Sequence, residues 1–426
     1  MQTGLLSEVY MKNKLDYSRE LDIWIWSNKP EIVKSADFLF SKIMKNIGGK
    51  FDQNRVKNHL KVFLTDIFVA HKQDNKLFIS FSRNKNSYRV SKRFDKIYLR
   101  YKYVILVTDF LIEHGYVEYH KGIKFSHYSR ESRIRATQKL LRLFRKYRSK
   151  AGVILRRNPP VILRDEDKQD IDFDMDTLEV KTIIRNVNRI NKCLDRHLIS
   201  ADVPWEEYAD FMLNCHINEQ TKKYVRIFNN SDFKQGGRFY FHWSQMIKSE
   251  IRKNITIDGK QTVELDYSCL HLSMLYGLEN MVPPAGDLYT LAGIDSCFRP
   301  IIKKAVNIAI NARNETSAMQ AIREEITQLT EKMGFVPPGP KTILENLKQA
   351  HSPIKKYFCT GYGVRLQYLD SSIAEQIMLS LAEEDICCLC IHDSFIVAKE
   401  HKALLHELMM NKFAKLFNFR PRISIK

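Results

Sequence analysis

The order of apolar and polar residues in the first part of the chain predicts alternating helices and strands. Apolar residues recur at helical spacing over 55–71 and 98–114. Residues 76–83 and 116–119 have instead the composition of β-strands, and the second strand leads into a basic hairpin turn. Two helices and a basic hairpin are typical of a winged helix, so we expect a winged-helix-like basic domain over 51–158.

The segment 130–148 places leucines on one face of a predicted helix and cations on the other. Such a face suits the phosphate backbone of a nucleic acid. A solvated face on a structural domain is the alternative, because charged runs often serve only solubility. Residues 1–50 have no assigned role.

Pro159-Pro160 and the acidic run that follows predict a linker over 159–177. A metal site in this run is the alternative, although no turn residues gather its aspartates. After the linker, 178–198 has helical periodicity and a basic face, which predicts a helical segment within 178–235.

The composition is that of a globular protein with a strongly basic balance. The chain has 426 residues, 44% of them hydrophobic and 27% charged, which is enough for two or three domains with buried cores. Lys and Arg number 68 against 49 Asp and Glu, and the formal net charge of +19 favours a polyanionic partner, nucleic acid first of all. An ordinary basic surface is the alternative.

Cysteine usage and hydropathy predict a cytoplasmic protein. The eight cysteines have no regular spacing, and the cluster Cys387-Cys388-Leu389-Cys390 has no second pair to complete a zinc site, so we expect reduced, buried thiols. The opening residues lack the apolar core of a signal peptide, and no stretch reaches the ~18 apolar residues that a membrane span needs. We therefore expect a soluble, nucleoid-associated protein without a membrane partner.

Two carboxylates stand where a metal site can form. In residues 262–276 a short apolar strand ends at Asp266 and an amphipathic helix follows. In 386–398 two β-rich runs flank His-Asp-Ser, which predicts a tight hairpin with Asp393 at its tip. Two-metal phosphoryl transfer requires carboxylates that bridge ions ~3.5–4 Å apart. Taken singly, each aspartate is more simply a cap or turn residue.

Between these segments, residues 298–311 form a predicted helix with Arg299 and Lys303 four positions apart on one face. Such a pair can neutralise a triphosphate. Its position between the two carboxylates strengthens this interpretation.

The three segments resemble motifs A, B and C of family A DNA polymerases and of the related phage-type single-subunit RNA polymerases. The likeness covers about the last 190 residues. Asp-Tyr-Ser at 266–268 is similar to motif A, and Arg299-x3-Lys303 is similar to the fingers helix of motif B. His-Asp-Ser-Phe at 392–395 is similar to motif C in the form typical of the RNA polymerases.

Two flanking segments add to the likeness. Gly237-Arg238, with Gln245 and Arg252, resembles the stretch upstream of motif A. Leu366-Gln367, before a helix expected over 370–383, resembles the stretch before motif C.

The resemblance implies a role for each matching residue. Asp266 and Asp393 would hold two Mg²⁺ ions, which Mn²⁺ can replace, with a backbone carbonyl from Tyr267. Lys303 would also protonate the leaving pyrophosphate. The residues expected to bind the triphosphate are Arg299, Lys303 and Lys304. The residues expected to bind the primer or template are Arg238, Gln245, Arg252, Gln367 and His392.

The chain also departs from the family. Family A DNA polymerases place a glutamate that excludes ribose five residues after the motif A aspartate, and here His271 takes that position, so the choice of sugar stays open. The residue sequence of motif A also resembles the form found in family B DNA polymerases. Asn307 and Asn311 stand where the relatives have an aromatic that stacks on the base pair. No proofreading exonuclease motif is recognisable in the first 235 residues.

Together these features predict an α+β protein with a right-hand polymerase palm and minimal fingers over 236–426. A thumb-like helical segment over 178–235 and the winged-helix-like domain would precede it. We expect a DNA polymerase of a mobile element, plasmid or phage that adds nucleoside triphosphates to a primer on a DNA template, with self-priming and a small partner subunit or helicase as further expectations. A single-subunit RNA polymerase and a non-catalytic DNA-binding replication initiator are the alternatives.

Overall fold

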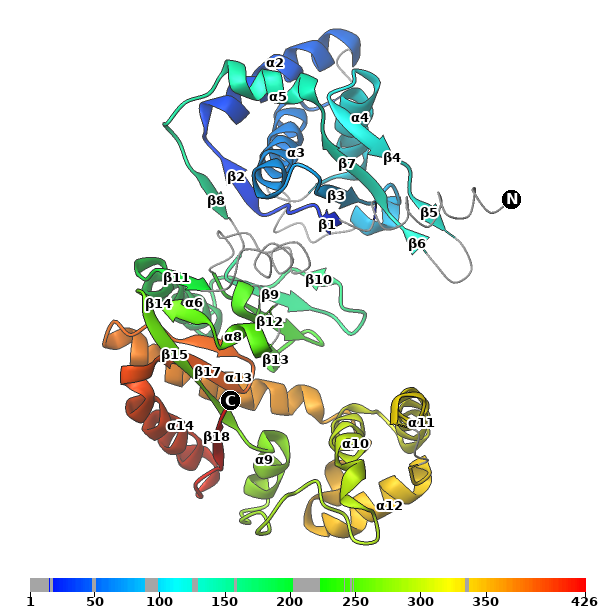
Figure 1. The fold of residues 1–426 in the computed structure, drawn as a ribbon, viewed down its shortest axis with the longest axis vertical. Coiled ribbons are helices and arrows are strands. Elements are labelled where there is room, and N and C mark those ends of the chain that lie inside the picture. Colours follow the sequence, from blue (N-terminus) through cyan, green and yellow to red (C-terminus); the bar gives the residue numbers. More distant parts are fainter. Residues whose placement is uncertain are drawn as a thin grey trace. The chain divides into compact units, whose positions relative to one another are not determined.

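The computed structural model describes residues 15, 18–47, 51–88, 99–124, 129–156, 159–201, 223–240, 242–245, 247, 249–333 and 337–426. Helices and several separate, largely antiparallel sheets make up the protein, which confirms the α+β class (Figure 1). The chain forms two compact units. The N-terminal unit contains Met1–Pro159, Asp170–Asp172 and Val203–Lys222, and the C-terminal unit contains Pro160–Gln169, Phe173–Asp202 and Lys223–Lys426.

The N-terminal unit is built around one four-stranded sheet with the order β1-β3-β7-β4. Its strands are β1 (Ser18–Glu20), β3 (Phe78–Phe81), β7 (Ser132–Ala136) and β4 (Val117–His120). Its helices are α2 (Pro30–Ile47), α3 (Gln53–Gln73), α4 (Tyr101–Glu113) and α5 (Gln138–Lys146). Smaller elements are β2 (Ile25–Ser27) paired with β8 (Ile154–Arg156), β5 (Ile123–Lys124) paired with β6 (Ser129–Arg130), and the 3₁₀ turn η2 (Lys85–Tyr88).

Helix α3 is the centre of this unit because its apolar residues bury one face along its whole length. Val56, Leu60, Phe63 and Ile67 follow helical spacing and are almost fully buried. Its buried Asp66 accepts a hydrogen bond of 2.8 Å from the equally buried Arg19 of β1. A buried charge needs such a partner, so the pair fixes how β1 lies against the helix.

The structure bears out most elements expected in this unit and corrects one. The helices expected at 55–71 and 98–114 are α3 and α4, and the strands expected at 76–83 and 116–119 are β3 and β4. The helix expected over 130–148 is only half present. Residues 132–136 form strand β7, because the buried Ser132 and Ile134 alternate with partly exposed neighbours and pair with β3, and the helix α5 begins at Gln138.

The C-terminal unit contains an antiparallel sheet with the order β11-β14-β15-β17-β16. Its strands are β11 (Ile199–Ala201), β14 (Ile255–Ile257), β15 (Lys260–Tyr267), β17 (Ser394–Ala398) and β16 (Leu389–Ile391). A sixth strand, β18 (Ile423–Ile425), pairs with the end of β15 on the edge opposite β17. The end of β15 is therefore enclosed between two strands.

A second sheet of this unit contains β9 (Val161–Arg164), β12 (Val225–Asn229) and β13 (Asp232–Tyr240). A linker was expected over 159–177, but the start of this segment is a buried strand. Val161, Ile162 and Leu163 are buried and pair in parallel with β12. The short strand β10 (Asp170–Ile171) follows. Within the described part of the chain, the acidic run joins no group of metal-binding geometry.

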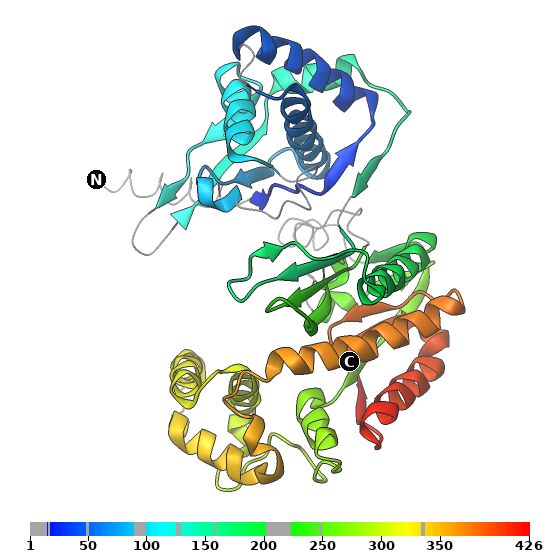
Figure 2. The same ribbon diagram turned by 180° about the vertical axis from the view of Figure 1, so that it is seen from behind.

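Helices cover these sheets and form a subdomain of their own (Figure 2). The helix expected over 178–198 is α6 (Leu178–Arg196), and the helix expected over 370–383 begins earlier, as α13 (Gly363–Glu383), so that Leu366 and Gln367 lie inside it. The remaining helices are α8 (Ser249–Arg252), α9 (Leu270–Leu278), α10 (Arg299–Asn311), α11 (Glu315–Met333), α12 (Pro340–Ala350) and α14 (Lys402–Phe417). The 3₁₀ turns are η4 (Trp243–Gln245), η5 (Ser296–Phe298), η6 (Ser352–Tyr357) and η7 (Lys399–His401).

Helices α10, α11 and α12 pack on one another, away from the sheets. This small helical subdomain lies in the sequence between α9 and α13, where minimal fingers were expected. Of the helices described, none is at once long and apolar enough to cross a membrane.

Candidate active site

Asp266, on strand β15, lies beside the turn between β16 and β17 that carries Asp393. Asp266, near the end of β15, is the register partner of Ser394, the first residue of β17. The amide N–H of Tyr267 donates to the carbonyl of Asp393 across 3.2 Å. Residues far apart in the sequence thus present two carboxylates at one end of the sheet.

The expected hairpin at His392-Asp393 is confirmed. Ile391 pairs with Ser394, so His392 and Asp393 form a two-residue turn between β16 and β17. His392 has a φ of +58°, the left-handed conformation that the first position of such a turn requires. Glycine is the usual residue there, and a side chain costs roughly 1–2 kcal/mol in that conformation.

Burial and the neighbouring Asp393 destabilise the ionised form of Asp266. Burial and then the charge of Asp393 raise the pKa of Asp266 to about 6, although Lys426 acts in the opposite direction. The Lys426 ammonium lies 2.9 Å from Oδ1 of Asp266 and 3.8 Å from Oε1 of Glu264. Two clustered carboxylates, one of them paired with the Lys426 ammonium, form a setting that suits a divalent metal ion.

Tyr267 can contribute only its backbone to such an ion. Its side chain is 3% exposed, and its hydroxyl donates to the carbonyl of Met409 across 2.6 Å. Its ring packs edge-on against Phe395. The side chain therefore belongs to the core beneath Asp266 and Asp393.

Glu264, two residues before Asp266, connects the strands beneath the site. It accepts a hydrogen bond of 2.6 Å from the hydroxyl of Ser394 and forms a 2.9 Å ion pair with Arg252. The Arg252 side chain is only 12% exposed. Arg252, expected to contact the primer, thus has its guanidinium directed at the acidic strand β15.

Gln245 has a comparable structural role. Its side-chain amide donates to the carbonyl of Phe239 at 2.8 Å and to that of Cys390 at 3.0 Å. These bonds join β13 to β16, one from each sheet. Like Arg252, Gln245 positions the strands that carry the site.

Arg238 and His271 share one buried partner, Asp370 of α13. Arg238 donates from Nε to Oδ2 of Asp370 at 3.1 Å, and Nε2 of His271 lies 3.1 Å from the same oxygen. The Asp370 side chain is 1% exposed. Burial acts to lower the pKa of Arg238, but the attraction of Asp370 outweighs it and the pKa is raised.

Asp370 was missed in the sequence. The sequence feature that could have indicated it is a carboxylate on an otherwise apolar helix face. The other residues of that face include Leu366, Ile373 and Ile377, which are all buried. A charge in such a row requires a buried cation, and Arg238 is that cation. His271, expected to select the sugar, is oriented by this pair.

The glycines before Arg238 form a bulge that positions it. In the β12–β13 pair, Ile227 faces Arg238 and Phe228 faces Gly236, so Gly237 is the extra residue. Gly237 has a φ of +74°, and a Cβ there would lie 2.6 Å from the Phe228 ring. Only glycine fits at this position, and this explains why a glycine directly precedes Arg238.

His392 and Gln367 lie near this group. Burial is the first cause, and Arg238 the second, of the lowered pKa of His392. Its ring centroid is 5.9 Å from that of Tyr240, on β13. Gln367 is half-buried on α13, one turn before Asp370.

The cations of α10 separate into two groups. Arg299 and Lys303 are exposed on the same face, as expected, and Lys303 forms no ion pair with any described residue. Arg299 binds Asp287, with one hydrogen bond of 3.2 Å, and lies 5.3 Å over the ring of Tyr289. Lys304 points elsewhere, because it forms an ion pair with Glu325 of α11.

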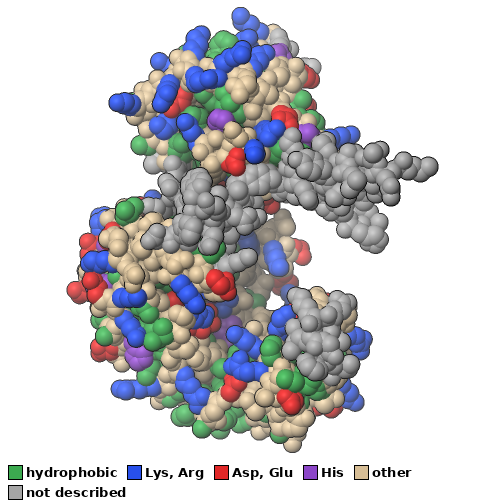
Figure 3. Space-filling view, in the orientation of Figure 1, with side chains coloured by type: hydrophobic (Ala, Val, Ile, Leu, Met, Phe, Trp, Pro, Cys, Tyr) green, Lys and Arg blue, Asp and Glu red, His purple; other side chains and the backbone are tan. Residues whose placement is uncertain are grey.

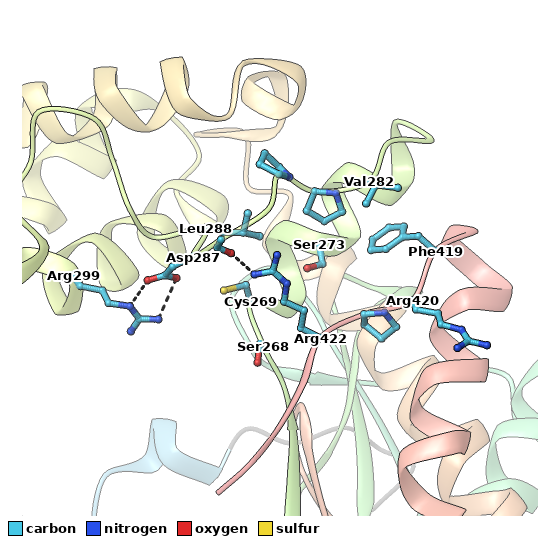
Figure 4. Close-up of a pocket in the computed structure, with 14 residues that line it drawn as sticks. Ser268, Cys269, Ser273, Val282, Asp287, Leu288, Arg299, Phe419, Arg420 and Arg422 are labelled. Carbon is cyan, nitrogen blue, oxygen red and sulfur yellow. Dashed lines mark hydrogen bonds and ion pairs between the residues drawn. The ribbon is translucent and has the colours of Figure 1, made fainter.

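A cleft of about 430 Å³ opens beside motif A, between the turn after β15 and the C-terminal segment (Figure 4). Ser268 and Cys269, which directly follow Tyr267, line one side, and Arg299 lines another. Arg420 and Arg422 are also among the lining residues, and Arg422 donates to the carbonyl of Gly286. These two exposed arginines were missed in the sequence, where a basic Arg-Pro-Arg before an apolar terminal strand is their only signal.

Asn307 and Asn311 both lie on α10, and this helix has no aromatic residue that could stack on a nucleotide base. The side chain of Asn311 donates to the carbonyl of Asn307 at 2.8 Å. It also lies against Gly363, where an added Cβ would collide with it. Asn311 thus holds α10 against the start of α13.

No protein-family profile matches the chain, and no curated protein matches it.

Proposed function

We propose that this protein is a metal-dependent nucleotidyltransferase that extends a nucleic-acid 3′-hydroxyl on a template, as a DNA polymerase with a right-hand palm and small fingers. The observation that carries the proposal is the convergence of Asp266 and Asp393 at one end of an antiparallel sheet. Strands β15, β16 and β17 supply the palm in this interpretation, and α10, α11 and α12 supply the fingers.

The residues present fit Mg²⁺. Asp266 and Asp393 would hold it, together with the carbonyl of Tyr267, because hard divalent cations prefer oxygen ligands. Burial first, and the charge of Asp393 second, raise the pKa of Asp266, and a bound cation would relieve both effects. A bound ion of this kind supplies activation of the 3′-hydroxyl and neutralises the leaving pyrophosphate.

The cleft beside motif A supports binding of a triphosphate. Arg299, Arg420 and Arg422 all line it, and guanidinium groups bind phosphate oxygens in bidentate geometry. Lys303 lies one turn from Arg299 and is free to approach a phosphate from the fingers side. Asp287, which now binds Arg299, would be displaced by the incoming negative charge.

Nucleic-acid binding by the N-terminal unit forms part of the proposal. Helix α5 buries Leu140, Leu143 and Phe144 and exposes its cations, and α2 packs beside it with exposed lysines. Lys and Arg side chains gather on this part of the unit (Figure 3). The basic patch consists of Lys34, Lys42, Lys45, Lys139, Arg142, Arg145 and Lys146. A winged-helix-like mode of DNA binding, a thumb-like role for α6, a nucleoid location, self-priming and a partner subunit or helicase remain parts of the same proposal.

A single-subunit RNA polymerase is the second candidate. His271 takes the place of the excluding glutamate, and its ring is directed at Asp370 and Arg238. No carboxylate stands at that position to reject ribose.

The test is extension of a labelled primer on a DNA template with Mg²⁺, with deoxynucleotides and ribonucleotides offered separately. Products from the unmutated protein that disappear in Asp266→Ala and in Asp393→Ala support the proposal, and the accepted nucleotide decides between the two polymerases. Glu383→Gln, at an exposed position of α13, is the matched control and keeps full activity. DNA binding that survives Asp393→Ala, without synthesis by the unmutated protein, points instead to a replication initiator.

A further inference from the structure

A second group of metal-binding side chains lies at the far end of α13 from Asp370. Cys193 and His197 are four positions apart at the end of α6, and Asp385 follows the end of α13. One ligand atom from each, thiol, imidazole and carboxylate, lies within 4.8 Å of the other two. From Asp370 to Asp385 the helix spacing corresponds to about 22 Å, so this group is separate from the carboxylates of β15 and β17.

The imidazole of His197 is oriented as metal-binding histidines are. Its Nδ1 lies 2.6 Å from Oδ2 of Asp258, and Asp258 also accepts a hydrogen bond of 2.8 Å from the amide of Leu198. A carboxylate on one ring nitrogen leaves the lone pair of the other for a metal ion. Nε2 is shielded from solvent, has no hydrogen-bond partner among the described residues, and lies 3.6 Å from Oδ1 of Asp385. That distance is too long for a hydrogen bond but suits two ligands of one ion.

The other two ligands come from different elements. Cys193 is 3% exposed, and its thiol lies 3.6 Å from the carbonyl of Ile386. Asp385 has a φ of +55°, an unusual conformation for a residue with a side chain, and this turn directs its carboxylate towards α6. Arg196 also binds Asp385, at 2.8 Å from its Nε. Both partners of that ion pair are about half exposed, so it holds the carboxylate only weakly against a competing cation.

We propose that Cys193, His197 and Asp385 bind a zinc ion, with water in the fourth position. A thiolate, an imidazole and a carboxylate are the ligand types that zinc takes, whereas Mg²⁺ avoids sulfur. Binding releases the thiol proton of Cys193, and the Arg196 side chain moves into solvent. The ion joins α6 to the segment that leads through β16 into the His392-Asp393 turn.

The experiment titrates cobalt(II) into the full-length protein after treatment with a chelator. Cobalt reports a tetrahedral site by its visible bands and a thiolate ligand by a charge-transfer band in the near ultraviolet. We expect saturation at one equivalent and displacement of cobalt by one equivalent of zinc. Absence of the charge-transfer band in the unmutated protein overturns the proposal, and so does saturation without displacement by zinc.

Variants separate this site from a plain ion-pair network. Cys193→Ser abolishes the charge-transfer band, and Cys297→Ser, at an exposed cysteine of η5, leaves it unchanged. Asp385→Asn, at an exposed position, weakens zinc binding by about tenfold or more, and Asp258→Asn weakens it about 10–100-fold through the orientation of His197. A band that persists in Cys193→Ser, or zinc affinity that is unchanged in Asp385→Asn, would falsify the assignment. The readout is metal binding, so it is independent of whether the protein polymerises nucleotides.

Discussion

The amide of Tyr267 donates to the carbonyl of Asp393 across 3.2 Å, and this bond holds the backbone of Asp393 beside the end of β15 that carries Asp266. Asp266 precedes the donor by one residue, and Asp393 carries the acceptor itself. Both side chains are therefore set by the ladder between β15 and the β16–β17 hairpin rather than by mobile loops. A site held on a strand and a tight hairpin turn keeps its geometry well, which the proposed two-metal chemistry would require.

Metal binding at this site is expected to depend on pH. The pKa of Asp266 is about 6 in the protein, so its carboxylate is protonated below that pH and cannot hold a cation. The apparent affinity for Mg²⁺ should fall about tenfold for each pH unit below 6 and level off above it. Isothermal titration of Mg²⁺ between pH 5 and pH 8 measures this, and an affinity that does not change over that range contradicts it.

Asp266→Asn is expected to stabilise the protein when divalent ions are absent. The pKa of Asp266 is raised from 3.8 to about 6, so its contribution to stability is fully present below pH 3.8 and is lost as the pH rises through 6. At pH 8 the variant should be more stable than the unmutated protein by up to about 3 kcal/mol, and the difference should shrink towards pH 4. Thermal unfolding in a chelator at several pH values tests the trend, and added Mg²⁺ should reverse the order.

Asp370→Asn is expected to destabilise the C-terminal unit. It leaves Arg238, whose side chain is 19% exposed, without its charged partner, and breaking such a buried pair costs about 3–5 kcal/mol. Urea unfolding followed by circular dichroism measures the change in midpoint. Glu383→Gln on the same helix is the control, because its ion pair with Arg189 is about half exposed on both sides and contributes at most about 1 kcal/mol. Equal midpoints for the two variants would show that the Arg238 pair is not buried in solution.

Arg299→Ala is expected to raise the KM for the nucleoside triphosphate in primer extension. Loss of one charge-assisted hydrogen bond to phosphate corresponds to about 1.5–3 kcal/mol, or roughly a 10–100-fold rise. Lys304→Ala is the matched control on the same helix, since its ammonium is directed at Glu325 of α11. If both variants change KM to the same extent, the cleft beside motif A is not the triphosphate site.

Replacement of Arg142, Arg145 and Lys146 by Gln is expected to weaken DNA binding in a salt-dependent way. These exposed cations of α5 belong to the basic patch, and the slope of log K against log salt should become shallower by about 0.9 for each phosphate that is no longer neutralised. Fluorescence anisotropy with a labelled duplex at several salt concentrations gives the slope. Lys57→Gln serves as the control, because Lys57 is paired with Asp37. A slope unchanged by the triple replacement would show that α5 faces away from DNA.

The sequence by itself determined the elements whose signals are local. Helices α3, α4, α6 and α10 follow from apolar periodicity, and the turn at His392-Asp393 follows from two apolar runs that leave room for only two residues. It also selected Asp266 and Asp393, because each stands where a strand ends. The short strand β7 was missed because its alternation is brief and lies beside a strongly amphipathic helix.

Only the tertiary structure decided which side chains meet. Arg238 and Asp370 are 132 residues apart in the sequence. No local sequence pattern around either residue shows that helix α13 places the Asp370 carboxylate beside Arg238 on the bulged strand β13. Likewise Arg252 was expected to bind the primer or template and Lys304 the triphosphate, but in the structure they form ion pairs with Glu264 and Glu325. Local spacing sets which face of an element is apolar. The partner of a polar residue depends instead on strand register and helix packing, which the whole chain determines together.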